Sequence, residues 1–247
     1  MKKVLKILYQ PYKWLVYFPF LIVSTLFFGS IAVILIAVSV NDKFVSLLCG
    51  VVWSRLNSYM TPMFVKVIGR ENVDKKQSYV IVSNHQSHFD VFVLYGWIGI
   101  DFKWVMKQEL RKVPVFGLAC EKVGFIFIDR SNKKAALASL EAAKEKIVDG
   151  TSVVFFPEGT RSTTGELMEF KKGAFRMALD LELPVLPLTI IGTKSILPNR
   201  TMNLLPGKTK MIVHKPIDTG KYSIKTIDKL MSKVKAVIKS GLDKYGG

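Results

Sequence analysis

A histidine and an aspartate that are five residues apart, His85 and Asp90, follow a short apolar stretch at residues 79–83. Side chains at this spacing on one ideal helix point about 140° apart, so the two meet only if His85 lies in a turn before a helix that carries Asp90. The carboxylate can then accept the Nδ1 proton of the imidazole and leave Nε2 free to remove a proton from a hydroxyl group. The spacing alone is more typical of a structural histidine, but its position after a strand and the blocks described below favour a general base.

Other residues of the chain are suited to binding an anion. Residues 156–162, Phe-Pro-Glu-Gly-Thr-Arg-Ser, also follow an apolar stretch, and in them Gly159 permits close backbone approach while Thr160 and Arg161 offer hydrogen-bond donors. A guanidinium group such as that of Arg161 can hold a phosphomonoester with two hydrogen bonds. The sequence therefore predicts a phosphate site here, to which Lys107 and Arg130 either contribute or serve as plain surface charges.

Four blocks of the sequence resemble those of the glycerophospholipid acyltransferase superfamily, and most closely those of the 1-acylglycerol-3-phosphate acyltransferases. Residues 84–90 match Asn-His-x-Ser-x-x-Asp, residues 124–130 match Gly-x-x-[Phe/Tyr]-Ile-x-Arg, and residues 156–162 match Phe-Pro-Glu-Gly-Thr-Arg-Ser in full. A Val-Pro-Val-x-Pro-like block is matched in part, with Leu183 where the first Val often stands. The resemblance extends from about residue 79 to residue 193.

The resemblance implies that His85 is the general base, that Asp90 orients it and that no acyl-enzyme forms. The implied reaction moves a fatty acyl group from a thioester, of acyl carrier protein or of coenzyme A, to the sn-2 hydroxyl of lysophosphatidic acid. Its product, phosphatidic acid, serves phospholipid biosynthesis, and neither a cofactor nor a metal is expected. The acceptor phosphate would lie among Lys107, Arg130, Glu158, Gly159, Thr160 and Arg161, with Glu158 and Gly159 shaping the pocket.

Two alternatives to this function stay open. The same chemistry can act on glycerol-3-phosphate or on a lysophospholipid with a larger head group. A non-catalytic membrane protein that binds anionic lipid also fits the composition, but it leaves the histidine and aspartate unexplained. A serine hydrolase and a P-loop nucleotide-binding protein are excluded, because the chain has neither a Gly-x-Ser-x-Gly elbow nor a Gly-x4-Gly-Lys-[Ser/Thr] loop.

The composition favours a membrane as the partner. The 247 residues include 36 Lys and Arg against 19 Asp and Glu, and a net charge of +17 indicates a polyanionic partner. Because 49% of the residues are hydrophobic, an anionic bilayer fits better than nucleic acid, which we do not expect as a partner. The only cysteines, Cys49 and Cys120, suggest no disulfide framework and fit a reducing compartment.

The N-terminal region is predicted to hold the chain in the membrane. Residues 14–41 carry no charge, and this stretch is longer than the roughly 20 residues that a helix needs to cross the hydrocarbon core and than a signal peptide. Residues 44–60 are also apolar but amphipathic, after a polar turn. Lysines at the N-terminus favour its retention in the cytoplasm, and a single crossing would then export a basic domain. We therefore expect residues 1–60 to form a two-helix hairpin in one leaflet of the cytoplasmic or inner membrane, a monotopic anchor that leaves the catalytic domain on the cytoplasmic face.

Residues 61–247 are predicted to form one α/β domain, a mixed central sheet flanked by helices. A helix capped by Ser131 and a C-terminal amphipathic helix at residues 224–242 should flank the sheet. The C-terminal helix should either pack on the sheet or face the membrane. Pro184 and Pro187 suggest an edge strand or the wall of an acyl-chain groove. The strand candidates are residues 79–83, 125–129, 152–156, 185–190 and 210–214.

Overall fold

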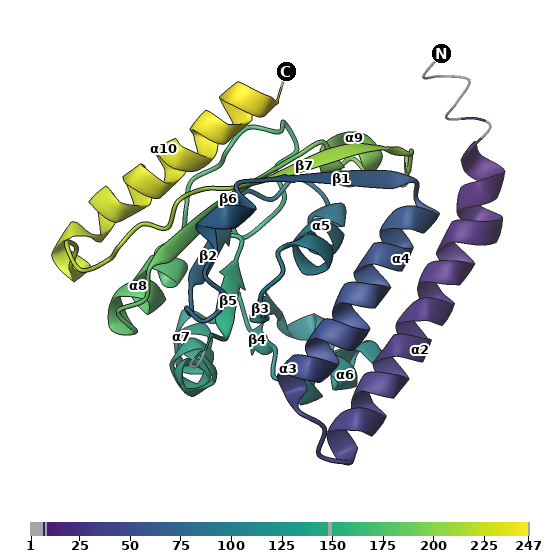
Figure 1. The fold of residues 1–247 in the computed structure, drawn as a ribbon, viewed down its shortest axis with the longest axis horizontal. Helices are drawn as coiled ribbons and strands as arrows, with labels where there is room; N and C mark the ends of the chain where they lie inside the picture. The colour runs from purple at the N-terminus through teal and green to yellow at the C-terminus, as the bar shows by residue number, and fades with distance from the viewer. Residues whose placement is uncertain (1–6, 8, 148–149, 247) are drawn as a thin grey trace.

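The computed structural model describes residues 7, 9–147 and 150–246, and in them a seven-stranded sheet has the order β1-β7-β6-β2-β5-β3-β4. Neighbouring strands are parallel except β6 and β7, which are antiparallel, so the predicted mixed α/β sheet is confirmed. Helices cover both faces (Figure 1). The strands are β1 Met63–Ile68, β2 Val80–Ser83, β3 Phe102–Lys107, β4 Ile126–Ile128, β5 Ser152–Phe155, β6 Val185–Ile191 and β7 Gly207–Val213.

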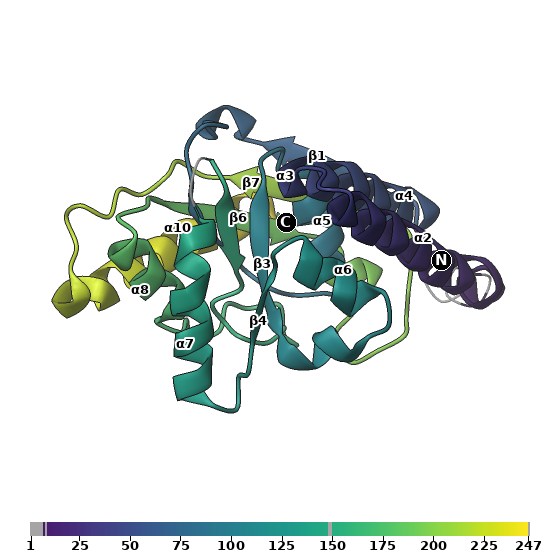
Figure 2. The same cartoon turned by 90° about the horizontal axis from the view of Figure 1, so that it is seen from below.

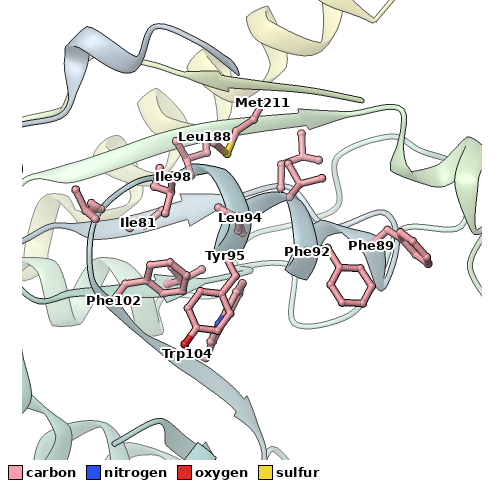
Figure 3. Close-up of a cluster of buried hydrophobic side chains, with 14 of the residues drawn as sticks. Ile81, Phe89, Phe92, Leu94, Tyr95, Ile98, Phe102, Trp104, Leu188 and Met211 are labelled. Atoms are coloured by element: carbon pink, nitrogen blue, oxygen red, sulfur yellow. The ribbon is translucent and has the colours of Figure 1, made fainter. Parts of the chain in front are cut away.

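The central strands are apolar on both sides because each side meets a helical layer. Along β2, Val80 and Val82 belong to one core and Ile81 to the other, as the alternation of strand side chains requires. Figure 3 shows Ile81 and Leu188 facing α5 (Phe89–Trp97), which contributes Leu94 to the same cluster. α5 is thereby fixed over the ends of β2 and β6.

The opposite face is covered by α7 (Lys133–Ala143), α8 (Gly173–Asp180) and α10 (Ile227–Tyr245). α10 buries Leu230, Val234 and Ile238 in the core of this face, so the predicted packing on the sheet is confirmed and the alternative of a membrane-facing helix is wrong.

The N-terminal region forms one long apolar helix, Tyr9–Ala37, whose last and longest part is α2 (Phe18–Ala37). Among the described residues it is the one helix that is long and apolar enough to cross a membrane, by length and composition alone. A turn leads to α3 (Asp42–Val45), a π-helical segment (Ser46–Val51) and α4 (Val52–Met60). α4 lies beside α2 (Figure 1), where Asn57 Nδ2 donates to Ser24 Oγ. Lys2, Lys3 and Lys6, on which part of the topology prediction rested, lie outside the described residues.

Two strands were not predicted, and one helix cap was assigned to the wrong residue. β1 pairs with β7, and β3 pairs with β4 and β5. β3 does so although it contains two lysines, one near its start and one at its end. One of them, Lys103, is buried and donates from Nζ to Asp42 Oδ2 at 2.7 Å. The N-cap of α7 is Asn132, whose side chain accepts from Ala135 N, whereas Ser131 donates to Asp129.

The strand with two prolines is central rather than an edge strand. β6 lies between β7 and β2, and none of its residues lines the main cavity, so both predicted explanations are wrong. The missing N–H of Pro187 is tolerated because antiparallel pairing with β7 begins one residue later, at Leu188. The carbonyl of Pro187 still accepts from His214 N, so the irregularity is confined to one position.

Candidate active site

His85 and Asp90 meet as their spacing requires. β2 ends at Ser83, His85 lies in the turn that follows, and Asp90 is in the first turn of α5. The Nδ1 atom of His85 is 2.8 Å from Asp90 Oδ2, and the Asp90 side chain is fully buried. An ionised Asp90 would fix the tautomer of the imidazole that carries its proton on Nδ1. Nε2 is then the basic atom.

The carboxylate of Asp90 is held by three further donors. Its Oδ2 also accepts from the backbone N–H groups of Gln86 and Ser87, at 2.7 and 2.9 Å. Its Oδ1 accepts from Thr193 Oγ1, from the start of α9 (Thr193–Ile196), at 2.5 Å. These hydrogen bonds prevent rotation of the group and hold Oδ2 against the imidazole. Thr193 was missed by the sequence analysis, since nothing local links it to Asp90.

Two other residues of the first block hold the turn in place. The side-chain amide of Asn84 accepts from Ile190 N and donates to Ile190 O, both at 2.8 Å, which joins the end of β2 to β6. Ser87 Oγ donates to the carbonyl of Leu197 and accepts from Phe89 N. Asn84 and Ser87 therefore tie the loop that carries His85 to β6 and to the residue after α9.

The Phe-Pro-Glu-Gly-Thr-Arg-Ser block supports the main chain of His85. Glu158 Oε1 accepts from His85 N at 2.8 Å, Glu158 Oε2 accepts from Met168 N at 3.0 Å, and Ser162 N donates to His85 O at 2.8 Å. Burial raises the pKa of the Glu158 carboxyl, and the two backbone donors oppose that rise. Glu158 is predicted from the sequence to shape the phosphate pocket. In the structure its contacts position the histidine, and so does the backbone N–H of Ser162.

Aromatic rings connect His85 to the interior of the protein. The ring of Phe156 stacks on the imidazole, with centroids 3.8 Å apart and planes at 10°. Trp104 stacks on Phe156 at 5.9 Å, and Tyr95 meets Trp104 edge to face at 6.2 Å. Figure 3 shows Tyr95 and Trp104 together beneath α5. The row of rings leads from the histidine to a buried apolar region.

A cavity of about 360 Å³ lies along this row of rings. Its walls come from α2, the segment from α3 to α4, α5, β3 and α6 (Phe116–Lys122), so the N-terminal helices complete it. One end is polar and the rest is apolar. The polar end contains His85, His88, Lys107, Arg130 and Arg161.

The predicted phosphate ligands divide into two groups. Lys107, Arg130 and Arg161 all line the cavity with His85, and burial lowers the pKa of both guanidinium groups without removing their charge. Lys107 is also paired with Glu109 at 2.6 Å. Gly159 and Thr160 do not line the cavity, and Gly159 instead accepts from Arg130 Nη1 through its carbonyl.

A second histidine, His88, was not assigned a role from the sequence. It lines the cavity near His85 and Arg161. Partial burial, with a smaller contribution from the neighbouring charge of Arg161, lowers the pKa of His88 to about 4. His88 is therefore a neutral side chain at the polar end under ordinary conditions.

Comparisons with known proteins agree with this geometry. The family model described as Acyltransferase matches residues 64–191. A 1-acyl-sn-glycerol-3-phosphate acyltransferase of Saccharomyces cerevisiae is 30% identical over 85% of this chain and 73% of its own length. LPAT1 of Arabidopsis thaliana, a chloroplastic enzyme of the same name, is 35% identical over 70% of this chain. The chain spans about half the length of this and two other curated relatives.

A solved structure is similar over nearly the whole chain. The crystal structure of the 1-acyl-sn-glycerophosphate acyltransferase PlsC from Thermotoga maritima superposes with a TM-score of 0.81 and 26% sequence identity. The likeness covers 99% of this chain and 97% of that one, so it includes the N-terminal helices as well as the sheet.

Proposed function

Because the chain belongs to the acyltransferase family, among the 1-acyl-sn-glycerol-3-phosphate acyltransferases, we propose that it transfers a fatty acyl group from a thioester to the sn-2 hydroxyl of lysophosphatidic acid. The observation that carries the proposal is the hydrogen-bonded pair of His85 and buried Asp90 at the polar end of an apolar cavity. A base beside cationic side chains and an apolar space suits an acceptor with a hydroxyl, a phosphate and a hydrocarbon chain.

In the proposed reaction His85 carries out both proton transfers. Nε2 removes the proton of the sn-2 hydroxyl while the hydroxyl oxygen attacks the carbonyl carbon of the thioester. The tetrahedral oxyanion collapses, the carbon–sulfur bond breaks, and the thiolate receives the proton that His85 holds. Asp90 stabilises the imidazolium formed between these steps, as the buried partner of Nδ1.

The two ends of the cavity would bind different parts of the substrates. Arg161, Arg130 and Lys107 would bind the acceptor phosphate, since guanidinium and ammonium groups are the usual phosphate ligands. The apolar part would hold a fatty acyl chain. A volume of about 360 Å³ is within the range of pockets for small ligands.

The N-terminal region, residues 1–60, would then be a two-helix anchor in one leaflet, with the α/β domain of residues 61–247 on the cytoplasmic face. The start of α3 supports this topology, because its first residue, Asp42, pairs with Lys103 of β3 at 2.7 Å. A helix start that is bonded to the first residues of a sheet strand stays on the side of the membrane that holds the sheet. Thiol labelling of an engineered cysteine at Asn41 from the opposite side would contradict the one-leaflet anchor.

Replacement of His85 tests the proposed function. His85→Ala should lower kcat for lysophosphatidic acid by about 10⁴-fold, because the proton acceptor is lost. The measurement is thiol release by the purified protein with an acyl-coenzyme A and an acyl carrier protein donor. Thermal unfolding of the variant should stay near that of the parent.

His88→Ala is the matched control, because His88 lines the same cavity and no hydrogen bond joins it to Asp90 among the described residues. It should lose far less activity than His85→Ala. A panel of glycerol-3-phosphate and larger lysophospholipids identifies the acceptor. Lipid binding without any thioester consumption by the parent protein would refute the proposal.

A further inference from the structure

Exposed apolar side chains continue beyond the N-terminal helices onto the segment between β3 and α6. In this segment Leu110, Val113 and Leu118 are 39%, 43% and 47% exposed. They lie within nine residues of one another, from the 3₁₀ turn at Gln108–Lys112 to the first turn of α6. We call residues 110–118 the rim segment, because Leu110 and Phe116 line the cavity. Neither the proposed catalysis nor the proposed anchor uses its exposed face.

The rim segment is continuous with the exposed face of α2. A Cβ atom at Gly29 would lie 3.0 Å from Val115 Cγ1 and 3.7 Å from Ala119 Cβ, so the segment packs directly on α2 at this glycine. Figure 2 shows α6 beside α2. Leu118 precedes Ala119 and turns about 100° away from that contact, toward the outside. The apolar surface of α2, which exposes Ile22, Leu26 and Phe27, therefore extends onto α6.

The backbone of the rim segment contains a strained tight turn that sets the directions of its side chains. Val115 has φ 60°, which a β-branched residue rarely adopts, and Phe116 N donates to Pro114 O at 2.6 Å in a γ-turn. Gly117 permits the sharp return, because a Cβ there would lie 2.1 Å from Arg111 O. The turn directs Val113 outward and Phe116 into the cavity. Strain of this kind persists where the surrounding structure imposes it, and it is concentrated at functional sites.

Basic side chains border the exposed apolar ones. Arg111, Lys112 and Lys122 lie within or just after the rim segment, and all three are exposed. Arg111 is paired with Glu121. An apolar face bordered by lysine and arginine is the composition of surfaces that insert at the head-group level of anionic membranes.

We propose that the rim segment is a second bilayer-contacting element, which extends the apolar surface of α2 and seats the edge of the cavity on a membrane containing anionic lipid. Leu110 is both exposed and part of the cavity wall, so a lipid chain can pass from the bilayer to the cavity beside it. This passage rests on the proposed function, whereas the contact with the bilayer does not.

Contact is tested with the full chain reconstituted in vesicles of phosphatidylcholine and phosphatidylglycerol. A polarity-sensitive fluorophore is attached to Leu118→Cys and, as the control, to Ile224→Cys, an equally exposed position before α10 on the other face of the sheet. The parent chain controls for labelling, because Cys49 and Cys120 are buried. Spin-labelled lipid should quench the fluorophore at position 118 by about twofold and leave position 224 unchanged. Equal quenching at the two positions, or none at position 118, overturns the proposal.

Lipid passage is tested with the double variant Val113→Asp/Leu118→Asp. Activity on lysophosphatidic acid carried in vesicles should fall by about tenfold, because charged side chains resist insertion, while turnover of a short-chain acceptor dissolved in water is unchanged. Ile224→Asp is the control with the same chemical change. Equal loss on both acceptors would contradict passage at the rim. If no variant or parent consumes thioester, the proposed function fails, and the quenching result still decides whether the rim segment contacts the bilayer.

Discussion

The two ends of the cavity are held together by different kinds of interaction. At the polar end, His85 is fixed by three hydrogen bonds: its ring bonds to Asp90, its N–H donates to Glu158, and its carbonyl accepts from Ser162 N. At the apolar end, Tyr95 is held mainly by packing. Among the described residues its side chain has one hydrogen bond, with Ser46 Oγ at 2.8 Å, and a Cβ at Gly50 would lie 2.1 Å from its ring.

The difference reflects two requirements: proton transfer needs a base held in a fixed position, whereas binding of a hydrocarbon chain needs only an apolar space of suitable size. A general base must keep its reacting atom within a fraction of an ångström, which only directional bonds from several elements provide. A hydrocarbon chain has no polar atoms to align, so shape and volume suffice to bind it. Substitutions at the polar end should therefore change the rate for every substrate, and substitutions at the apolar end should change the preference among acyl chains.

Among the variants that test this difference between the two ends, Asp90→Asn should have the largest effect on activity. An amide keeps the size of the side chain but presents N–H groups to some of the four donors that now bind the carboxylate. It also favours the tautomer of His85 with the wrong nitrogen protonated. We expect kcat to fall by about 10³-fold for all acyl donors.

The control for this variant is Thr193→Ser, which keeps the hydroxyl that donates to Asp90 Oδ1. It should retain most of the activity, whereas Thr193→Val should lose part of it. Steady-state kinetics with two donors of different chain length distinguish a change in rate from a change in preference. A chain-length-dependent loss for Asp90→Asn would contradict the proposed division between the two ends.

A smaller effect is expected from Cys49→Phe at the apolar end. Cys49 lines the cavity and is 5% exposed, so a phenyl ring there occupies space that an acyl chain would use. Loss of room for two methylene groups corresponds to about 1.6 kcal/mol of hydrophobic binding, or roughly a tenfold shift in kcat/KM toward shorter donors.

The matched control is Cys49→Ala, which removes the thiol without adding volume and should leave the preference unchanged. A donor series of increasing chain length provides the measurement, with thermal unfolding to detect overpacking. An unchanged preference together with a uniformly lower rate would show that the apolar end does not hold the acyl chain.

The contacts that could be predicted from the sequence are local ones. The geometry of His85 and Asp90 followed from their spacing and from the strand before them. Thr193 and Glu158 could not be found in this way, because they lie 103 and 73 residues from their partners and reach them only through the order of the strands. The block that looked like a phosphate loop therefore also positions the base.

The sheet shows the same limit. β2, β4, β5, β6 and β7 were predicted because each contains a short apolar run in the sequence. β3 was not, since Lys103 interrupts its pattern. The lysine is buried there because Asp42, 61 residues away at the start of α3, supplies the compensating charge. A prediction of β3 would have required knowing where the N-terminal helices dock.

The smallest effect concerns His88 at the polar end. Its pKa of about 4 in the folded protein, set by burial and then by Arg161 and His85 against the opposing charge of Asp90, lies below the value of about 6.5 expected for an unfolded chain. As the pH falls from 6.5 to 4, the unfolded state takes up a proton that the folded state does not, so stability decreases.

His88→Gln should remove this contribution. Because His88 is partly exposed, the drop in unfolding temperature between pH 7 and pH 5 should shrink by only about 2 °C. The control is Lys239→Gln, at an exposed position of α10. It changes a charge that does not titrate in this pH range and should leave the drop in unfolding temperature as it is in the parent. Equal drops in the parent and in His88→Gln would mean that the cationic end of the cavity does not hold this histidine neutral.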